Sequence, residues 1–251
     1  MDESLTSRVA AVAALDEPTR RRLYDFVVRQ PAPVSRDAAA EALGLSRSTV
    51  VFHLDRLVGQ GLLDVVSERR TGGPGAGRPS KLYRRAGQQI AVSLPGRQYE
   101  LAGRLLATAV QEADATGQSP RTILDRLARQ LGQDIGRAAR DAHPSRTARD
   151  SSSRPARDAH SGPPAGDAHA GRQAVMETLE DFGFEPRTAD AEIVLGNCPF
   201  HTLAQQHTDL VCGMNLCLLN GLLDELNATG LTARLQPEPG HCCVRLQEAT
   251  P

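Results

Sequence analysis

Five cysteines in the last quarter of the 251-residue chain are the residues best suited to metal chemistry. Soft thiolate ligands favour zinc or an iron–sulfur cluster. Thirteen residues separate the first two cysteines, and 29 separate Cys212 from Cys242. This spacing differs from the paired CxxC pattern of a zinc ribbon, so the ligands would come from separate structural elements. The five are Cys198, Cys212, Cys217, Cys242 and Cys243.

Three of these thiols fall where a helix or a strand is expected to begin or end. Cys198 follows an expected strand, Cys212 lies near the start of a helix over residues 208–227, and Cys242 opens the last strand. Thiolates at the ends of elements can reach one shared point, so we predict that these three hold a metal or cluster. Cys217 lies in the middle of the same helix and is expected to pack in a core.

The sequence leaves the identity of the fourth ligand open. Cys243 follows Cys242 directly, and in a regular strand only one of two neighbours can face the metal. His201, His207 and His241 are the other candidates. The alternative is that the cysteines are small apolar core residues that bind nothing.

Residues 35–63 indicate a second kind of chemistry, the recognition of DNA. Small and apolar residues at helical spacing predict one helix that ends at Gly44 and a second that begins at Ser46. Two helices joined by a short turn with a glycine are typical of a helix-turn-helix. The buried stripe of the second helix is expected to comprise Val50, Leu54, Leu57 and Val58. The side chains expected to face away from it, toward base edges in the major groove, are Ser46, Arg47, Ser48, Thr49 and His53.

A basic hairpin follows the two helices. Residues 61–68 and 81–85 read as strands, and the Gly/Pro-rich stretch 69–80 joins them, so we predict a β-hairpin wing. Between Arg69 and Arg85 the chain has six basic residues and no acidic one. Such a wing suits the phosphates and the minor groove of DNA, and Arg78 and Lys81 are its candidate contacts.

The stretches DEPTRRRLYDFV, VVFHLDRLVGQGLL and GRPSKLYR together resemble the winged helix-turn-helix of ArsR-type bacterial regulators. The resemblance covers about the first third of the chain. It implies a transcription factor, usually a homodimer on an inverted repeat of double-stranded DNA. It also implies that the residues at Ser46, Arg47, Ser48, Thr49 and His53 enter the major groove.

The stretches NCPFH, LVCGMN and GHCCVRL resemble the C-terminal half of the Suf-type iron–sulfur repressors. The stretch RPSKLY resembles the wing of the same iron–sulfur-sensing branch. The resemblance implies a cluster held by Cys198, Cys212 and one of Cys242 and Cys243. The family has four spaced cysteines, and its third position falls near Asn227, where this chain has none. This departure leaves open three cysteines with a histidine or an outside ligand, a binuclear cluster, or zinc.

The expected elements give an α+β protein. A helical region at residues 5–30, restarted near Pro18 and capped by Asp16, precedes the helix-turn-helix. Helices at 98–114 and 120–140 could pair across a dimer or pack within one chain, and both readings stay open. The predicted organisation is a winged helix-turn-helix at 1–90, a helical linker or dimerisation segment at 91–140, a disordered linker at 141–171 and a small α/β sandwich sensor domain at 172–251.

The charge is distributed unevenly along the chain. Residues 1–90 carry 14 Arg and Lys against 10 Asp and Glu, whereas residues 172–251 carry 4 Arg against 11 acidic residues. A basic part beside an acidic one suggests a nucleic-acid module joined to a sensor. The chain has no apolar run long enough to span a membrane and no basic start typical of a signal peptide, so we expect a cytoplasmic protein.

The sequence therefore predicts a DNA-binding transcriptional regulator controlled by an iron–sulfur cluster or, alternatively, zinc, and not an enzyme. A second hypothesis is a regulator that senses a small organic effector and uses its cysteines for packing. A third is a cysteine-dependent enzyme that uses Cys198 and His201. We disfavour the third because no acidic residue is evident that would orient the histidine.

Overall fold

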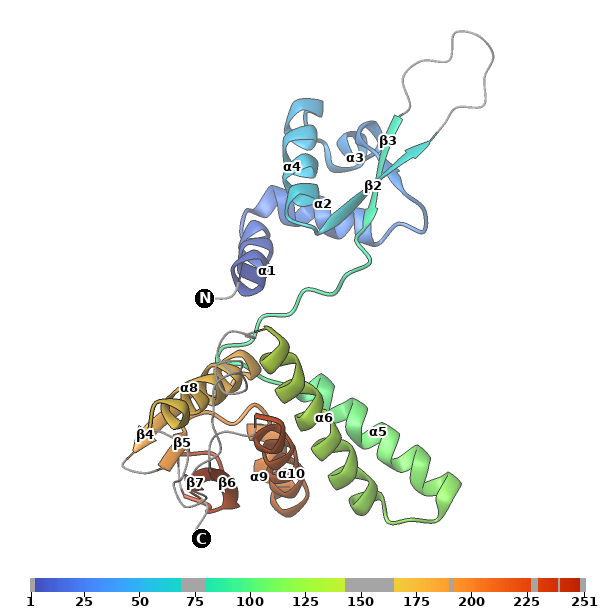
Figure 1. Cartoon of the computed structure of the whole chain (residues 1–251). Coiled ribbons are helices and arrows are strands. Elements are labelled where there is room, and N and C mark those ends of the chain that lie inside the picture. Colours follow the sequence, from blue (N-terminus) through green and yellow to red (C-terminus); the bar gives the residue numbers. More distant parts are fainter. Residues whose placement is uncertain are drawn as a thin grey trace. The chain divides into compact units, whose positions relative to one another are not determined.

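The computed structural model describes residues 3–68, 80–142, 165–189, 192–226, 230–238 and 240–248 (Figure 1). These residues belong to two compact units, unit 1 (residues 1–92) and unit 2 (residues 93–251). Each unit has its own hydrophobic core. The α+β class predicted from the sequence is confirmed.

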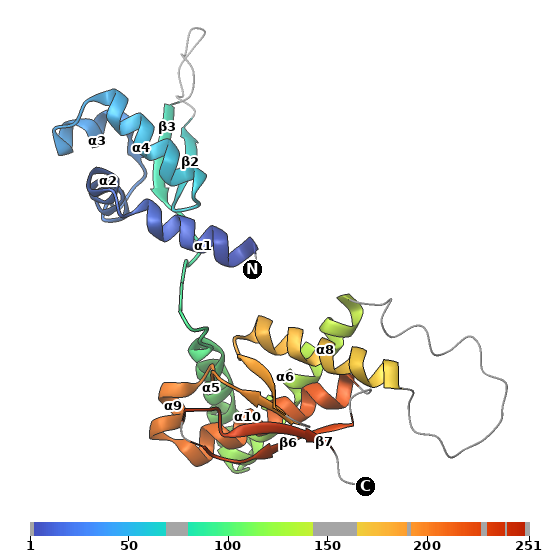
Figure 2. The same ribbon diagram turned by 90° about the vertical axis from the view of Figure 1, so that its left-hand side faces the viewer.

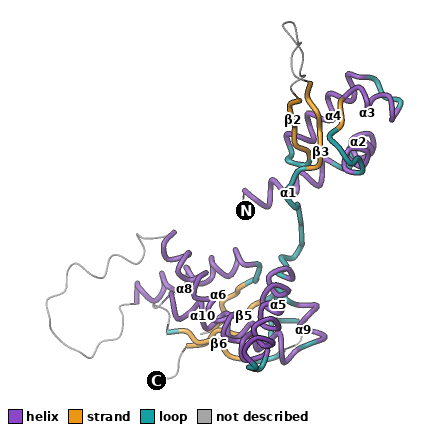
Figure 3. Tube along the Cα trace, turned by 90° about the vertical axis from the view of Figure 1, so that its right-hand side faces the viewer, coloured by secondary structure: helices purple, strands orange, loops and turns teal. Residues whose placement is uncertain are grey.

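Unit 1 combines short helices with a small antiparallel sheet of order β1-β3-β2. In Figure 3 the helices α3 and α4 lie beside the strands β2 and β3. The strand register pairs Leu63 with Arg85 and Val34 with Tyr83, so a hairpin wing is present as predicted. The elements are α1 (Glu3–Ala14), α2 (Pro18–Val28), β1 (Val34–Ser35), α3 (Arg36–Leu43), α4 (Arg47–Gly59), β2 (Leu63–Glu68) and β3 (Ser80–Arg85).

Local sequence signals explain where these helices begin and end. The Ser46 side chain caps α4 and Gly44 ends α3 in a left-handed conformation with φ 63°. The cap of α2 is Glu17 and not Asp16, because the Glu17 carboxylate accepts hydrogen bonds from the backbone N–H groups of Thr19 (2.9 Å) and Arg20 (2.6 Å). The apolar faces then meet in one core around Leu23, Val27, Val50, Leu54, Leu57, Leu63 and Tyr83.

Unit 2 contains a four-stranded antiparallel sheet of order β4-β5-β7-β6. Buried and less buried residues alternate along β5 and β7 and at the start of β6. The buried set (Ile193, Leu195, Ala233, Val244 and Leu246) shares a core with α10, which lies beside β6 and β7 (Figure 2). The elements are α5 (Tyr99–Thr116), α6 (Pro120–Ala142), α8 (Ala165–Phe182), β4 (Pro186–Ala189), β5 (Glu192–Leu195), α9 (His201–Gln206), α10 (Thr208–Leu226), β6 (Leu231–Leu235) and β7 (Val244–Glu248).

Glycines bring the backbones of α6 and α10 into direct contact. A Cβ atom on Gly132 would lie 1.9 Å from the carbonyl oxygen of Leu218, and one on Gly221 would lie 2.1 Å from that of Arg129. No larger residue fits at either place without moving a helix, because these distances are far below van der Waals contact. The close approach of α6 and α10 therefore depends on glycine at these two positions.

The helices expected to form a separate linker at 91–140 belong instead to the core of unit 2. Ala102 of α5 and Ile123 and Ala128 of α6 are buried in the same cluster as Leu218. Of the two readings, packing within one chain is the one observed. Most of the segment 141–171 lies outside the described residues, but both of its described ends are helical, since α6 reaches Ala142 and α8 begins at Ala165. Among the described residues, no helix is long and apolar enough to cross a membrane.

Candidate functional site

The first turn of α4 presents short polar side chains in a fixed arrangement. The Ser46 Oγ accepts a hydrogen bond from the Thr49 N–H at 3.2 Å and lies 2.7 Å from the Thr49 Oγ1 and 3.0 Å from the Ser48 Oγ. Ser46 and Ser48 are exposed, whereas Thr49 is half-buried. The cap therefore orients the end of the helix that meets base edges in a helix-turn-helix.

Arg47 is the exposed cation of this turn. Its Nε lies 3.0 Å from the Asp37 Oδ1 of α3, and the two side chains are 70% and 67% exposed. An ion pair this exposed contributes less than about 1 kcal/mol, so the guanidinium can exchange Asp37 for a phosphate or a base at little cost. The predicted role of Arg47 is compatible with its position.

His53 does not face away from the buried stripe, and that part of the prediction is wrong. It is only 9% exposed, and its Nδ1 lies 3.4 Å from the Glu17 Oε2 at the start of α2. Helical geometry places residue 53 on the same face as Val50, Leu54 and Leu57, which are fully buried. In this structure the imidazole joins α4 to α2 and is not available to bases.

Phe52 was missed by the sequence reasoning. Its side chain is 66% exposed on α4, one turn after Ser48. Residues 48, 52 and 55 lie near the centre of the face opposite the buried stripe, because successive residues turn by about 100°. The signal in the sequence is the spacing of four residues between Ser48 and Phe52, which places both on one face of the helix.

A buried tyrosine ties the wing to the helix-turn-helix. The Tyr83 hydroxyl of β3 accepts a hydrogen bond from the Arg36 Nε of α3 at 3.1 Å and donates one to the Asp55 Oδ1 of α4 at 3.5 Å. Burial raises the pKa of Tyr83, so the phenol stays protonated and keeps donating. The neighbouring Lys81 is exposed, as a phosphate contact requires, whereas Arg78 lies outside the described residues.

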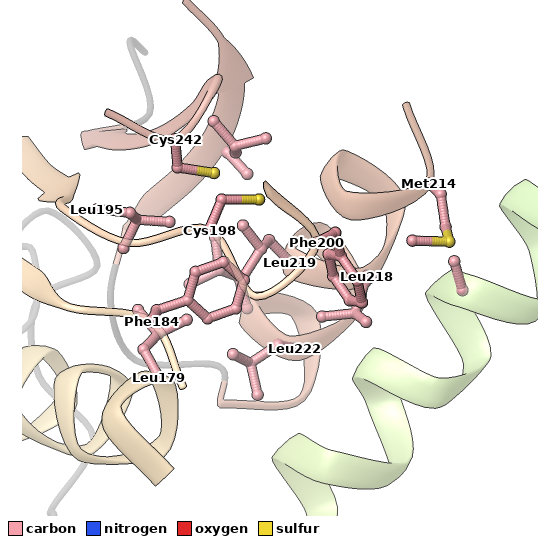
Figure 4. Packing of buried hydrophobic residues seen from close by; sticks show 14 of the residues in the cluster. Leu179, Phe184, Leu195, Cys198, Phe200, Met214, Leu218, Leu219, Leu222 and Cys242 are labelled. Carbon is pink, nitrogen blue, oxygen red and sulfur yellow. The ribbon is translucent and has the colours of Figure 1, made fainter. Parts of the chain in front are cut away.

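In unit 2 two cysteine thiols face each other in the core. Figure 4 shows Cys198, from the loop after β5, and Cys242, from the loop before β7, with their sulfur atoms close together. A hydrogen bond from Cys242 lowers the pKa of Cys198, and the Phe200 N–H and the positive charge of Arg97 lower it further against the effect of burial. The same hydrogen bond and burial raise the pKa of Cys242, so Cys198 is the thiol of the pair that ionises more readily.

A second pair of thiols adjoins the first. Burial raises the pKa of Cys212 on α10 to about 12, and a hydrogen bond and charge from Cys243 and the charge of Cys198 add to the shift. The charge of Cys243 also acts on Cys242. The four residues Cys198, Cys212, Cys242 and Cys243, from here on the cysteine cluster, therefore interact with one another although they come from three segments of the chain.

An amide of α10 completes the surroundings of this cluster. Asn215 is 1% exposed, and its Nδ2 donates a hydrogen bond to the Cys242 Sγ at 3.4 Å. Its Oδ1 is buried and, within the described part of the chain, has no hydrogen-bond partner. A buried polar atom without a partner costs about 1–3 kcal/mol, and such atoms in folded proteins call for a specific reason.

The thiols meet in pairs and not as a closed set of ligands. Among the described residues, no group of three or more His, Cys, Asp or Glu side chains is arranged to hold a metal ion. The predicted histidine ligands His201 and His207 are exposed at the two ends of α9, and in the part of the chain that the structure describes neither has a hydrogen bond or ion pair with a thiol. Cys217 packs against the core of unit 2, as predicted.

Part of unit 1 is similar to a known protein family. Residues 15–66, from just before α2 into β2, match the family model described as a helix-turn-helix domain. No curated protein and no solved structure matches the chain. The match supports a winged helix-turn-helix and indicates a DNA-binding transcriptional regulator.

Proposed function

We propose that the protein binds a double-stranded DNA operator through α4 and the wing, and that an iron–sulfur cluster or a metal at the cysteine cluster controls its affinity for that operator. One observation carries the sensor half of this proposal. Four cysteine side chains from three segments of unit 2 interact: Cys198, Cys212 and Cys242 are buried, and Cys243 is half-buried. Thiols that several segments bring together are the donor set that a soft metal or an iron–sulfur cluster requires.

The DNA half rests on the exposed face of α4 in a basic unit. Arg47 and Ser48 are exposed at the helix start, and Lys81 is exposed on the neighbouring strand of the wing. Residues 1–90 carry a net charge of +4, whereas residues 172–251 carry −7. Because DNA is an anion, unit 1 and not the acidic C-terminal part is suited to bind it. A unit with one recognition helix reads one half-site, so we propose a homodimer on an inverted repeat.

The donor chemistry of the cysteine cluster suits a soft metal. Thiolates are the ligands of iron–sulfur clusters and of many zinc sites, and the lowered pKa of Cys198 favours its thiolate form. The orphan oxygen of Asn215 marks a position where a hydrogen-bond donor, such as a water beside a bound group, would satisfy a buried acceptor. The cysteine cluster thus matches a soft metal in its donor atoms, although its thiols, as described, meet in pairs.

The residues around the thiols have separable tasks. Arg97 and the Phe200 N–H stabilise the negative charge on Cys198, and Asn215 orients the sulfur of Cys242. Phe200, which is fully buried, excludes water from the same region. When bound, an iron–sulfur cluster or zinc would supply a cross-link between the three cysteine-bearing segments. The state of unit 2 would then set the spacing of the two recognition helices in the homodimer, as a two-state equilibrium.

The small-effector alternative has weaker support. A groove between α6 and α8, lined by residues that include Ile135, Ala139 and Phe182, has a volume of about 260 Å³. Glu177 and Asp181 also line it, and no cysteine does. A wider depression on α6, of about 500 Å³, is lined by charged and amide side chains alone. Pockets for drug-sized ligands usually have about 300–1,000 Å³ and are mostly apolar, and neither hollow meets both conditions. We therefore place the signal at the cysteine cluster.

The test combines metal analysis with operator binding. The full chain is purified without oxygen, its iron, sulfide and zinc are measured, and its operator is selected from random duplex DNA. We expect stoichiometric metal and a change in operator affinity of about 5- to 150-fold when the metal is removed, the range of a coupling of about 1–3 kcal/mol.

The matched pair of variants is Cys198→Ala and Cys217→Ala. Cys198→Ala should lose the bound metal and its effect on DNA binding, whereas Cys217→Ala should keep both because Cys217 lies outside the cluster. A metal-free wild-type protein, or a Cys198→Ala variant with full metal content, would refute the sensor half. A protein that prefers no duplex sequence would refute the DNA half.

A further inference from the structure

Phe52 is an exposed aromatic residue at the centre of a face that is otherwise polar. It is 66% exposed, and it is the one large apolar side chain of α4 that is exposed. Ser48 lies one turn before it, Asp55 nearly one turn after it, and Arg56 next to that, all of them exposed. A surface that docks another protein usually has several apolar residues together, and here there is a single one.

The position of Phe52 makes it part of the recognition surface of α4. Four residues of helix span about 6 Å, so Phe52 follows Ser48 along the axis by a distance that corresponds to one or two base pairs. It lies on the side opposite the core residues Val50, Leu54 and Leu57. When α4 enters the major groove with Ser48 toward the bases, the ring of Phe52 faces base edges as well.

The chemistry of the ring restricts what it can recognise there. A phenyl ring neither donates nor accepts a conventional hydrogen bond, so it gains nothing from the N7, O6, N4 or N6 atoms of the base edges. The apolar group that standard bases present in the major groove is the C5-methyl of thymine. Contact with it removes water from both the methyl group and the exposed ring.

We infer that Phe52 determines part of the operator sequence by packing on the C5-methyl group of a thymine in each half-site. This inference deepens the proposed DNA binding and rests on it, but it does not depend on the cysteine cluster. It predicts that the affinity for the operator falls when one methyl group is removed at one position of the half-site, next to the base pair that Ser48 approaches.

The experiment replaces thymine by uracil, which removes the methyl group and leaves base pairing unchanged. Each thymine of the selected half-site is replaced in turn, and affinity is measured for the full-length wild type, Phe52→Ala and Phe52→Leu. For the wild type, one position should weaken binding by about fourfold, the change expected for about 0.8 kcal/mol of lost methyl burial. Phe52→Ala should weaken binding to the thymine operator by about tenfold.

The decisive comparison is the combination of both changes. In Phe52→Ala the sensitive position should lose its dependence on the methyl group, because the side chain that contacts it is gone. Phe52→Leu should keep part of the dependence, since leucine is still apolar. Leu94→Ala, which removes a side chain that is 78% exposed outside the helix-turn-helix, should behave as the wild type.

The outcomes separate this inference from the proposed function. Sequence-specific binding that is equally sensitive to uracil in the wild type and in Phe52→Ala overturns the role of Phe52 and leaves the DNA half of the proposal intact. A wild type that dimerises through Phe52, so that Phe52→Ala is a monomer in solution, overturns it as well. A protein without sequence preference overturns both. Unchanged thermal unfolding of Phe52→Leu verifies that the fold is not the cause.

Discussion

The recognition face of α4 and the cysteine cluster place their chemistry in opposite environments. Arg47 is 70% exposed in its side chain, whereas Cys242 is 2% exposed. Exposed groups interact weakly within the chain and are free to meet a partner. Buried groups are perturbed by burial itself and by one another: burial first, and then Cys243 and Cys198, raise the pKa of Cys212 to about 12. Changes on α4 should therefore alter binding without altering stability, and changes around the cluster should alter both.

The largest expected effect is a loss of stability in unit 2 alone. In Gly132→Ala the new Cβ would lie 1.9 Å from the Leu218 oxygen, so α6 and α10 must separate. We expect unit 2 to lose about 3 kcal/mol or more of its free energy of unfolding, above the usual cost of overpacking, because the clash is with backbone. Calorimetry should show a lower unit 2 transition and an unchanged unit 1 transition.

The control for this change is Gly103→Ala on α5. A Cβ there meets nothing within 4 Å, so the variant should be neutral or up to about 1 kcal/mol more stable, since alanine favours a helix. If both glycine variants unfold at the same temperature, the close contact of α6 and α10 does not hold unit 2 together.

The next effect concerns binding by the exposed face. Arg47→Ala should weaken operator binding by about tenfold, the equivalent of about 1.4 kcal/mol, because it removes a cation at the start of α4. Its unfolding should change by less than about 1 kcal/mol, since the pair with Asp37 is exposed. Arg104→Ala, an exposed cation of α5, is the matched control in a filter-binding or gel-shift assay. Wild-type affinity in Arg47→Ala would remove this residue from the interface.

A smaller effect is expected on the stability of unit 1. Tyr83→Phe removes the hydroxyl that joins Arg36 of α3 to Asp55 of α4. We expect unit 1 to lose about 1 kcal/mol of stability, the usual net value of a hydrogen bond, and unit 2 to be unaffected. Chemical denaturation followed by a probe in each unit measures this. A shift in both units would mean that they do not unfold independently.

The smallest expected effect is a pH dependence at the cap of α2. Burial raises the pKa of Glu17, but the N–H groups of Thr19 and Arg20 and the charge of His53 lower it more, so the pKa lies below its ordinary value of 4.5. The ionised cap therefore stabilises unit 1 above that value, and this contribution disappears as the pH falls through the lowered pKa. Glu17→Gln should flatten the fall in the unit 1 melting temperature below pH 5 or so. An unchanged slope would show that Glu17 plays no such part.

Local signals in the sequence were sufficient for most elements. The ends of α4 follow from Ser46 and from the apolar stripe, and the amphipathic pattern of α6 gave its position. His53 was misplaced because a histidine among polar residues reads as exposed, although the 3.6-residue period puts it beside Leu54 and Leu57. Phe52 was missed for the converse reason, since an aromatic residue reads as core until its neighbours on the helix are counted.

What the sequence by itself determined is local. It determined which segments are helices and strands, where Gly44 and Ser46 divide the helix-turn-helix, and which cysteines stand at the ends of elements, because caps, turns and periodicity depend on neighbours within a few residues. Only the tertiary structure decided that α5 and α6 join the core of unit 2, that Cys198 pairs with Cys242, and that Asn215 is buried beside them. These contacts join residues far apart in the chain, and their formation depends on packing that no local pattern encodes.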